Sequence, residues 1–411
     1  MTKVGTCCMV SLFCAAVAIV SPAQIIFTSL ASFALTNGAK PYSTLIRGVD
    51  GNFYGTTNIG GDYDEGTVFR ISPGGTLTTL HSFNGGDGGW PLGALVQAND
   101  GNFYGTTGIG GHGGGGCDFL GCGTVFKMTP SGTLTTVYSF GGTDGAHPGA
   151  GLVQATDGNF YGTTAEGGAH NNCHDGCGTV FKVTPGGTLT SLHSFNYSDG
   201  AYPFAALLQA SDGNFYGTTA GGFNCGDYGC GTVFKITPAG MLTIVHSFDD
   251  TDGAEPDAGL VQARDGNFYG TTIYGGYGGS NCPDQSPAGC GTVFRLTPGG
   301  VLTTLYSFCS QPNCVDGSFP YAGLVEARDG SFYGTTQQGG AYGAGAVFKI
   351  TPEGALTTLH SFNGGDGGWP WGGLVQAIDG FFYGTTSLGG AYGDGTVFRL
   401  GVVRACSICR P

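Results

Sequence analysis

The stretch Asp50–Thr57 reads DGNFYGTT, and the same eight letters, or seven of the eight, return six more times along the chain. The further copies begin at Asp100, Asp157, Asp212, Asp265, Asp329 and Asp379. Successive copies lie 50 to 64 residues apart, a period typical of architectures in which each repeat packs against its neighbours. Because stacked repeats build one continuous core, we expect the 411 residues to form one domain.

Each repeat contains four short segments that read as strands. In the third copy they are GLVQA (151–155), NFYGTT (159–164), GTVFKVTP (178–185) and TLTSLHSF (188–195). Each segment is rich in Val, Phe, Tyr or Thr and is bounded by Gly, Asp or Pro, as in antiparallel strands joined by turns. Four-stranded units at this period predict the blades of a β-propeller.

The two ends of the chain each carry part of one repeat. Residues 26–33 match a fourth strand, whereas the last copy, residues 373–400, contains the first three strands and lacks a fourth. We therefore predict an all-β, seven-bladed β-propeller of four-stranded antiparallel blades, whose last blade is completed by the N-terminal strand. Such a ring leaves no sheet edge exposed. A β-solenoid is the alternative fold, but it does not explain why the chain begins with a lone fourth strand.

Residues 1–23 have the features of a Sec-type signal peptide. One lysine precedes an apolar run that ends at Val20, and Ser21 and Ala23 occupy the small-residue positions of a cleavage site. An uncleaved anchor is the competing interpretation, which the helix-breaking Pro22 disfavours. The expected organisation is a signal peptide (1–23), a propeller (24–400) and a C-terminal tail (401–411). We expect a secreted, periplasmic or cell-surface protein with no stable membrane insertion after cleavage.

Twelve cysteines follow the signal segment, and they fall into six close pairs. The pairs are Cys117/Cys122, Cys173/Cys177, Cys225/Cys230, Cys282/Cys290, Cys309/Cys314 and Cys406/Cys409. Close pairs in an exported chain predict disulfides. A zinc site built from His170, Cys173, His174 and Cys177 is the alternative for one loop. The equivalent loops keep the cysteines without the histidines, so a disulfide is favoured there too.

The charge balance argues against a nucleic-acid partner. With 14 basic and 28 acidic residues the net charge is −14, which repels phosphate backbones and anionic bilayers. Seven of the cations follow Val-Phe in the third strand of successive repeats: Arg70, Lys127, Lys182, Lys235, Arg295, Lys349 and Arg399. Antiparallel pairing brings each toward the Asp of its own DG turn, so we expect ion pairs within blades rather than an anion site around the axis.

Three motifs recur in fixed order: DGNFYGTTxxGG, GTVFKxTPxG and TLTTLxSF. Together they resemble the repeat of the choice-of-anchor tandem repeat GloVer family, from Phe27 to Leu400. The resemblance implies a bacterial exported or surface protein and no particular reaction. A weaker similarity links the DG turn and the Thr-Pro-x-Gly turn to streptogramin-lyase-type propellers. The catalytic histidine and metal-binding acid of those enzymes have no match here, so this similarity implies fold alone.

The best candidate for recognition is the face that carries the loops after the second and fourth strands. The seven Asp/Asn-Gly-x-x-Pro loops place six different residue types before their prolines, and all three tryptophans lie in these loops. The predicted ligand-binding residues are Trp90, Tyr202, Phe319, Trp369, Trp371, Asp87 and Asp366. Rigid aromatic groups beside acids suit stacking on sugar rings or anchoring an extracellular protein. In the alternative interpretation these aromatic side chains plug the spaces between blades.

No Ser-His-Asp set, paired catalytic carboxylates or phosphate-binding loop stands out, so the sequence predicts no catalytic residue and no cofactor. Acids at Asp62, Asp64 and Glu65 lack EF-hand spacing, and no metal site is predicted. The sequence thus predicts a binding or scaffold module that recognises glycan or protein. A lyase-type propeller enzyme with a central pocket is the alternative, with Glu326 as the one acid on the otherwise uniform first strands. A purely structural surface protein is the second alternative.

Overall fold

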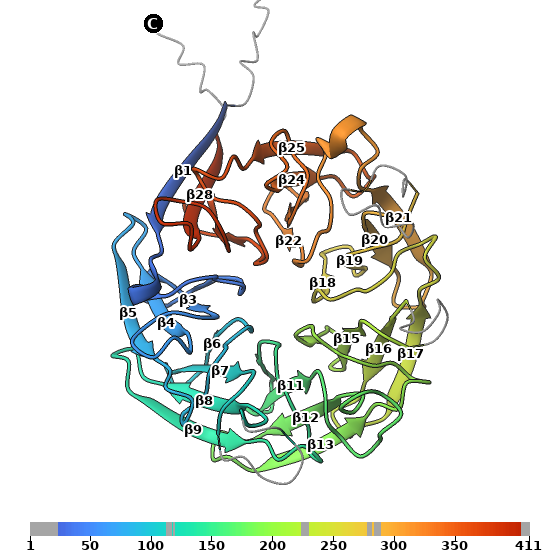
Figure 1. Cartoon of the computed structure of the whole chain (residues 1–411). Coiled ribbons are helices and arrows are strands. Elements are labelled where there is room, and N and C mark those ends of the chain that lie inside the picture. Colours follow the sequence, from blue (N-terminus) through green and yellow to red (C-terminus); the bar gives the residue numbers. More distant parts are fainter. Residues whose placement is uncertain are drawn as a thin grey trace, which may run out of the picture.

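The computed structural model describes residues 24–111, 117, 120–222, 230–277, 282 and 289–403. They form seven four-stranded antiparallel sheets around one axis (Figure 1). The short first strands of the repeats lie nearest the centre and the fourth strands lie at the periphery. The seven-bladed propeller predicted from the repeats is confirmed. No helix in the described part of the chain is long and apolar enough to cross a membrane.

The blades are numbered here in chain order. Blade 1 contains β2 (Ile46–Arg47), β3 (Phe53–Thr57), β4 (Thr67–Ile71) and β5 (Leu77–Ser82). Blade 2 contains β6 (Val96–Gln97), β7 (Phe103–Thr107), β8 (Thr124–Met128) and β9 (Leu134–Ser139). Blade 3 contains β10 (Val153–Gln154), β11 (Phe160–Thr164), β12 (Thr179–Val183) and β13 (Leu189–Ser194). Blade 4 contains β14 (Leu208–Gln209), β15 (Phe215–Thr219), β16 (Thr232–Ile236) and β17 (Leu242–Ser247).

Blade 5 contains β18 (Val261–Gln262), β19 (Phe268–Thr272), β20 (Thr292–Leu296) and β21 (Leu302–Ser307). Blade 6 contains β22 (Val325–Glu326), β23 (Phe332–Thr336), β24 (Ala346–Ile350) and β25 (Leu356–Ser361). Blade 7 contains β26 (Val375–Gln376), β27 (Phe382–Thr386), β28 (Thr396–Val403) and the N-terminal strand β1 (Gln24–Ser32). The 3₁₀ turns η1 (Leu35–Asn37) and η3 (Pro312–Cys314) lie in the loops.

The ring is closed by the first strand of the chain. Strand β1 pairs antiparallel with β28, from Gln24 opposite Val403 to Ser32 opposite Thr396. Figure 1 shows the two strands side by side, blue against red. Strand β1 begins two residues before the expected range 26–33 and ends one residue earlier, and β28 continues three residues past the expected end of the last repeat at residue 400. The N-terminal strand therefore completes the last blade, as predicted.

Two rings of aromatic contacts join neighbouring blades. In each YGTT motif the tyrosine stacks on the phenylalanine that begins the second strand of the next blade, with ring centroids 4.0–4.2 Å apart. Nearer the periphery, the phenylalanine after each fourth strand meets the third-strand phenylalanine of the next blade edge-on, at 5.0–5.3 Å. Both sets contain seven contacts, one for each blade interface. The apolar residues of the second and third strands are thereby buried between sheets, whereas the outer fourth strands stay partly exposed.

The Asp of each DG turn holds the end of its own blade's tyrosine. The Tyr54 hydroxyl donates to Asp50 at 2.8 Å, and the other six pairs lie at 2.9–3.1 Å. Burial, together with the nearby Asp50 carboxylate, raises the pKa of Tyr54 to about 12. In three blades the third-strand lysine also forms an ion pair with the DG-turn Asp of its own blade, with 2.8 Å between Nζ and Oδ2. These ion pairs are Lys127–Asp100, Lys235–Asp212 and Lys349–Asp329, and they confirm the predicted pairing within those blades.

The glycine of the YGTT motif leaves room for two side chains of its own blade. A Cβ atom on Gly162 would lie 2.7 Å from Phe181 Cζ and 2.9 Å from Leu152 Cδ2. The equivalent glycine meets the same two kinds of neighbour in every other blade. A glycine in mid-strand is therefore required by packing rather than by its backbone angles.

Gly162→Ala should destabilise the propeller by about 1–3 kcal/mol, because the added methyl group overpacks the blade. Gly186→Ala is the matched control in the same blade, since its Cβ would meet nothing closer than Thr184 Oγ1 at 3.9 Å. Urea unfolding of both variants measures the difference. Equal midpoints for the two variants would contradict this account of the motif glycine.

Candidate functional site

The variable loops after the second strands and the D-G-x-x-P loops lie on one face of the ring. An isolated antiparallel bridge joins the two loops at each of the seven blade junctions. These bridges are Ala39–Ile59, Gly89–Ile109, Ala146–Glu166, Ala201–Gly221, Ala254–Tyr274, Ser318–Gln338 and Gly368–Leu388. The predicted sharing of a face by these two loop sets is confirmed. We call it the loop face.

The residue before each loop proline has a left-handed backbone. Lys40, Trp90, His147, Tyr202, Glu255, Phe319 and Trp369 all have φ between 52° and 57°. A positive φ is uncommon for residues with a side chain and persists where surrounding contacts fix it. The Trp90 N–H donates to the Glu65 carbonyl of blade 1 at 2.9 Å, and its own carbonyl accepts from Gly108 of blade 2 at 3.1 Å. The other six positions make the same two bonds, so each residue ties one blade to the next.

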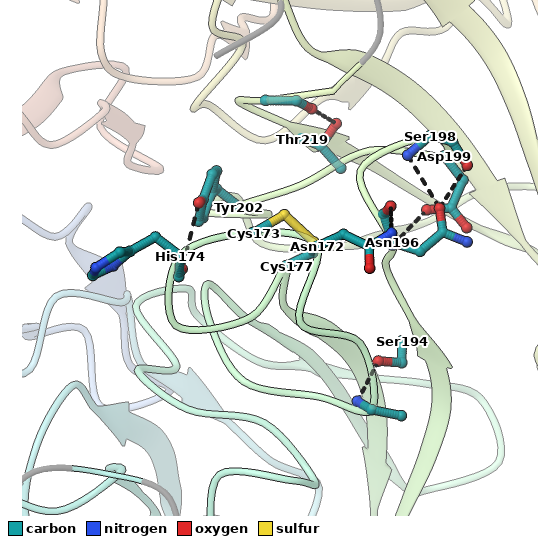
Figure 2. Close-up of a disulfide and its surroundings, with 12 residues drawn as sticks. Asn172, Cys173, His174, Cys177, Ser194, Asn196, Ser198, Asp199, Tyr202 and Thr219 are labelled. Atoms are coloured by element: carbon teal, nitrogen blue, oxygen red, sulfur yellow. Dashed lines mark hydrogen bonds between the residues drawn. A yellow bond between two sulfur atoms is a disulfide. The ribbon is translucent and has the colours of Figure 1, made fainter. Parts of the chain in front are cut away.

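The structure separates the predicted aromatic residues into three environments. Trp90 and Trp369 are 41% and 40% exposed on the loop face. Tyr202 is half-buried, and its hydroxyl donates to the His174 carbonyl at 3.5 Å (Figure 2). Phe319 is buried edge-on against Tyr274, at 5.5 Å between centroids, so it fills space between loops. The fifth residue, Trp371, lies at the centre of the ring and is described below.

The two predicted acids, Asp87 and Asp366, are engaged inside their own loops. Asp87 Oδ2 lies 2.9 Å from His81 Nε2, and its Oδ1 accepts the N–H of Asn84 at 3.0 Å. Although burial alone would raise it, these partners hold the pKa of Asp87 below its usual value. Asp366 is placed in the same way, 3.0 Å from His360. Both carboxylates thus shape loops that position neighbouring residues.

Four of the six predicted disulfides are present with both cysteines described. They join Cys117 to Cys122, Cys173 to Cys177, Cys282 to Cys290, and Cys309 to Cys314. Figure 2 shows the bond between Cys173 and Cys177, which removes both thiolates from any zinc site in that loop.

Cys230 belongs to a predicted pair of which the structure describes only one member. This cysteine is buried and disulfide-bonded, as expected. Its expected partner, Cys225, lies outside the described residues, so the described part of the chain does not show the Cys225–Cys230 bond that the sequence predicts. Cys406 and Cys409 both lie outside the described residues as well. The pairings Cys225–Cys230 and Cys406–Cys409 therefore stay predictions.

The residues that follow the seven loop prolines surround one cavity of about 450 Å³. They are Tyr42, Leu92, Gly149, Phe204, Asp257, Tyr321 and Trp371. Because equivalent positions of all seven loops line it, the cavity lies on the axis of the ring, at the loop face. We call it the axial cup.

Aromatic rings form one wall of the axial cup. The Trp371 ring lies 4.3 Å from Tyr321 and 5.0 Å from Tyr42, centroid to centroid. Phe204 is 44% exposed, and Leu92 lies beside Gly149, which adds no side chain. Burial raises the pKa values of Tyr42 and Tyr321, so both hydroxyls stay protonated at neutral pH and can donate hydrogen bonds.

Each cup residue is held on both sides along the chain. The left-handed residue lies two positions before it. The residue that directly follows each cup residue is held by its carbonyl, which accepts a hydrogen bond from the first Thr of the preceding blade's YGTT motif. Examples are the bonds from Thr56 to Gly93 and from Thr218 to Ala258. The seven bonds measure 2.7–3.4 Å. The cup is therefore preorganised by the backbone rather than by its own side chains.

Asp257 is the one charged residue among the seven cup positions. The residue is partly exposed, but its Oδ1 atom is enclosed and has no hydrogen-bond partner among the described residues. Burial, and secondarily Glu255, raises the pKa of Asp257 well above its usual value. The pKa of Glu255 is raised by burial as well. The cup thus combines an apolar wall with one poorly solvated acid.

Glu326, the one acid predicted on the first strands, forms a hydrogen bond between neighbouring blades. Its Oε2 accepts the backbone N–H of Arg264 in the neighbouring blade at 3.2 Å. Glutamine makes the same bond elsewhere, as from Val49 N–H to Gln97 at 2.9 Å. Glu326 therefore replaces a glutamine in a clamp between blades, away from the axial cup.

A second hollow of about 540 Å³ lies on the loop face between the loops of blades 2 and 3. His147, Glu166 and His170 line it, with His147 Nε2 3.6 Å from Glu166 Oε2. Four of its fourteen lining residues are glycines, and Asn171 and Asp175 line it as well. None of its lining residues is Phe, Tyr or Trp, so it lacks the aromatic wall of the axial cup.

Trp371 is the one cup residue among the predicted ligand-binding residues, and Asp257 is not among them. The usable signal was the position after the proline, which reads Tyr, Leu, Gly, Phe, Asp, Tyr and Trp around the ring. Only one of these letters is charged. Four of the predicted aromatic residues precede the proline instead, a position at which the residue type varies as widely as at the position after it.

The His81–Asp87 pair can be tested against a natural counterpart in blade 7, where Ala31 and Asn37 occupy the equivalent positions. The Asn37 side chain accepts the Ala34 N–H at 3.0 Å and needs no histidine. His81→Ala should destabilise by about 1–2 kcal/mol, because Asp87 loses its partner. His81→Ala/Asp87→Asn should recover part of that loss in urea unfolding. A double variant less stable than the single one would refute the pairing.

Asp257→Asn should stabilise the propeller at neutral pH. Since the folded state raises this pKa, the folded state binds more protons than the unfolded chain as pH rises above 3.8, and stability falls through that range. Asparagine does not ionise, so the variant should not lose stability in this way as the pH rises. Thermal melts should show a higher Tm than the native protein at pH 7 and no difference at pH 3. A lower Tm at pH 7 would mean that the carboxylate has a stabilising partner.

The family model described as the Gloeobacter/Verrucomicrobia repeat matches residues 15–120, 120–282 and 281–405. No curated protein matches the chain. Among solved structures, it is similar to the periplasmic gluconolactonase PpgL of Pseudomonas aeruginosa, at 17% identity and TM-score 0.49, over 82% of this chain and 93% of that one. It is also similar to a PQQ-bound aldose sugar dehydrogenase of Streptomyces coelicolor, at 15% identity and TM-score 0.46, over 93% and 99%. The motifs, the sevenfold ring and the matched family model together show that this chain belongs to the Gloeobacter/Verrucomicrobia repeat family.

Proposed function

We propose that the protein is an exported binding module that recognises carbohydrate at its loop face, with the axial cup as the principal contact. The observation that supports this proposal is the convergence of aromatic side chains from separate blades on one cavity. Small-ligand sites are concave, largely apolar and fitted with a few polar groups, and the cup has this composition.

Carbohydrate fits the chemistry of the cup and its rim. Sugar rings present flat C–H faces that pack on aromatic rings, and their hydroxyls pair with a few fixed polar groups. Trp371 and Tyr321 offer aromatic faces inside the cup, with the hydroxyls of Tyr42 and Tyr321 and the Asp257 carboxylate beside them. Trp90 and Trp369 are exposed on the same face and extend the surface outward for a longer chain.

Export is supported by the disulfides. Four described bonds close short loops on the loop face, and such bonds persist in oxidising compartments. A secreted, periplasmic or cell-surface location follows from this proposal. The expected signal peptide, residues 1–23, lies outside the described residues.

An enzyme with a central pocket is the second candidate, and Asp257 is the observation that favours it. A carboxyl group with a raised pKa can serve as a general acid near neutral pH. Most glycoside hydrolases need a second carboxylate across the scissile bond. Glu255, two residues away, is the nearest other acid of this loop. Product formation from a bound polysaccharide, abolished by Asp257→Asn, would establish this function.

The carbohydrate proposal predicts saturable binding of bacterial or plant polysaccharides to the oxidised protein. The chain from Gln24 to Pro411 serves for the measurement, because it retains every strand of the ring. Isothermal titration should show binding that Trp371→Ala weakens at least tenfold, equivalent to about 1.4 kcal/mol. The double variant Trp90→Ala/Trp369→Ala should weaken the binding of long polysaccharide chains more than the binding of short ones.

Met241→Ala is the control, since this methionine is 72% exposed and lies at the turn between β16 and β17, at the opposite end of the blade from the loop face. It should bind as the native protein does. Absence of binding to every polysaccharide would overturn the carbohydrate proposal and leave a protein partner or a structural role. Binding unaffected by either tryptophan variant would place the site elsewhere.

A further inference from the structure

The strongest unexplained feature of the axial cup is the state of Asp257. Its Oδ1 atom is enclosed without a hydrogen-bond partner among the described residues, and its backbone N–H is directed at the Glu255 carbonyl, at 3.0 Å. A carboxylate oxygen that is enclosed without a partner costs free energy, so such groups are normally paired with a cation or replaced. The six other loops build the same turn with uncharged residues at this position. The fold therefore has no need of the acid.

The walls of the cup favour a positively charged occupant. Asp257 lies between Phe204 and Tyr321 in the order of the loops, and the Tyr321, Trp371 and Tyr42 rings continue the wall from there. Aromatic faces carry a negative quadrupole that attracts cations, most strongly where water is excluded. An acid beside such a wall complements an ammonium group better than a neutral or anionic one.

The charged groups around the cup reinforce this preference. None of the seven lining residues is basic, and Glu255 adds a second acid beside Asp257. Lys40 and His147 occupy the position equivalent to Glu255 in loops that lie three and two places away around the ring. The protein as a whole carries a net charge of −14, which attracts small cations by long-range electrostatics.

We propose that the axial cup binds an organic ammonium ion, with Asp257 as its counter-ion and the Tyr42, Trp371 and Tyr321 rings as its aromatic wall. A cavity of about 450 Å³ accommodates one sugar-sized group. Resting on the proposed function, the inference names the carbohydrate as one that carries a free amine, an amino sugar. A simple alkylammonium ion offers the same chemistry without the sugar.

The test compares matched ligands by isothermal titration at pH 7 and low salt, with the change in tryptophan fluorescence as a second readout. The ligands are a β-1,4-linked glucosamine tetramer, its fully N-acetylated form and tetramethylammonium. The amine tetramer should bind at least tenfold more tightly than the acetylated one, and tetramethylammonium should compete with it. Asp257→Asn should abolish that tenfold preference. The variant is expected to fold, because it removes a charge that is poorly solvated and adds no heavy atom.

Asp62→Asn is the control, because it changes the net charge equally at an exposed residue of the loop face outside the cup. It should keep the preference, and an equal loss in both variants would reduce the effect to general electrostatic attraction and overturn the inference. Equal binding of the two tetramers would overturn the ammonium site and leave the carbohydrate proposal standing. Asp257-dependent binding of tetramethylammonium alone would support the ammonium site and refute its assignment to an amino sugar. No binding of any of the three ligands would overturn the ammonium site, and the polysaccharide titrations described above would then decide the carbohydrate proposal separately.

Discussion

Stacking of each motif tyrosine on a phenylalanine of the next blade is the contact on which the rest of the molecule depends. A four-stranded blade that is apolar on both faces has no stable place in water until another blade covers each face. Seven such contacts at 4.0–4.2 Å form a closed circuit only when every blade is complete. The DG turn fixes each tyrosine hydroxyl, and the YGTT glycine leaves space for the third-strand phenylalanine. The residues of the repeated sequence motif thus act together to form the contact between neighbouring blades.

The loop face works differently, because its backbone repeats while its side chains do not. The left-handed residue, the proline and the threonine bond recur at all seven junctions. What varies is the side chain on each side of the proline. The same construction yields a buried plug at Phe319, an exposed ring at Trp369 and an enclosed acid at Asp257. Any specificity of this ring for a ligand has to reside in those differences.

The architecture could be predicted almost completely from the sequence, whereas the site could not. Period, turn residues and the unpaired fourth strand at residues 26–33 determine a closed ring because only one arrangement gives every strand a partner. The environment of Asp87 was not predictable, since nothing in the letters says that it faces His81 rather than solvent. Nor does the sequence show that the residues after the prolines meet at the axis. They come together only because the closed ring places equivalent residues of all seven loops at the same distance from its axis. Asp257 is unremarkable in its own repeat and becomes informative only beside the six residues that share its cup.

The left-handed residue before each proline has one more consequence. Its conformation is imposed by two main-chain hydrogen bonds to neighbouring blades, so the identity of its side chain contributes little to holding the turn. Lysine, tryptophan, histidine, tyrosine, glutamate and phenylalanine all occur there within a single chain. The ring therefore carries a set of interchangeable display positions whose occupants can be exchanged, in evolution or in the laboratory, without redesign of the scaffold that presents them.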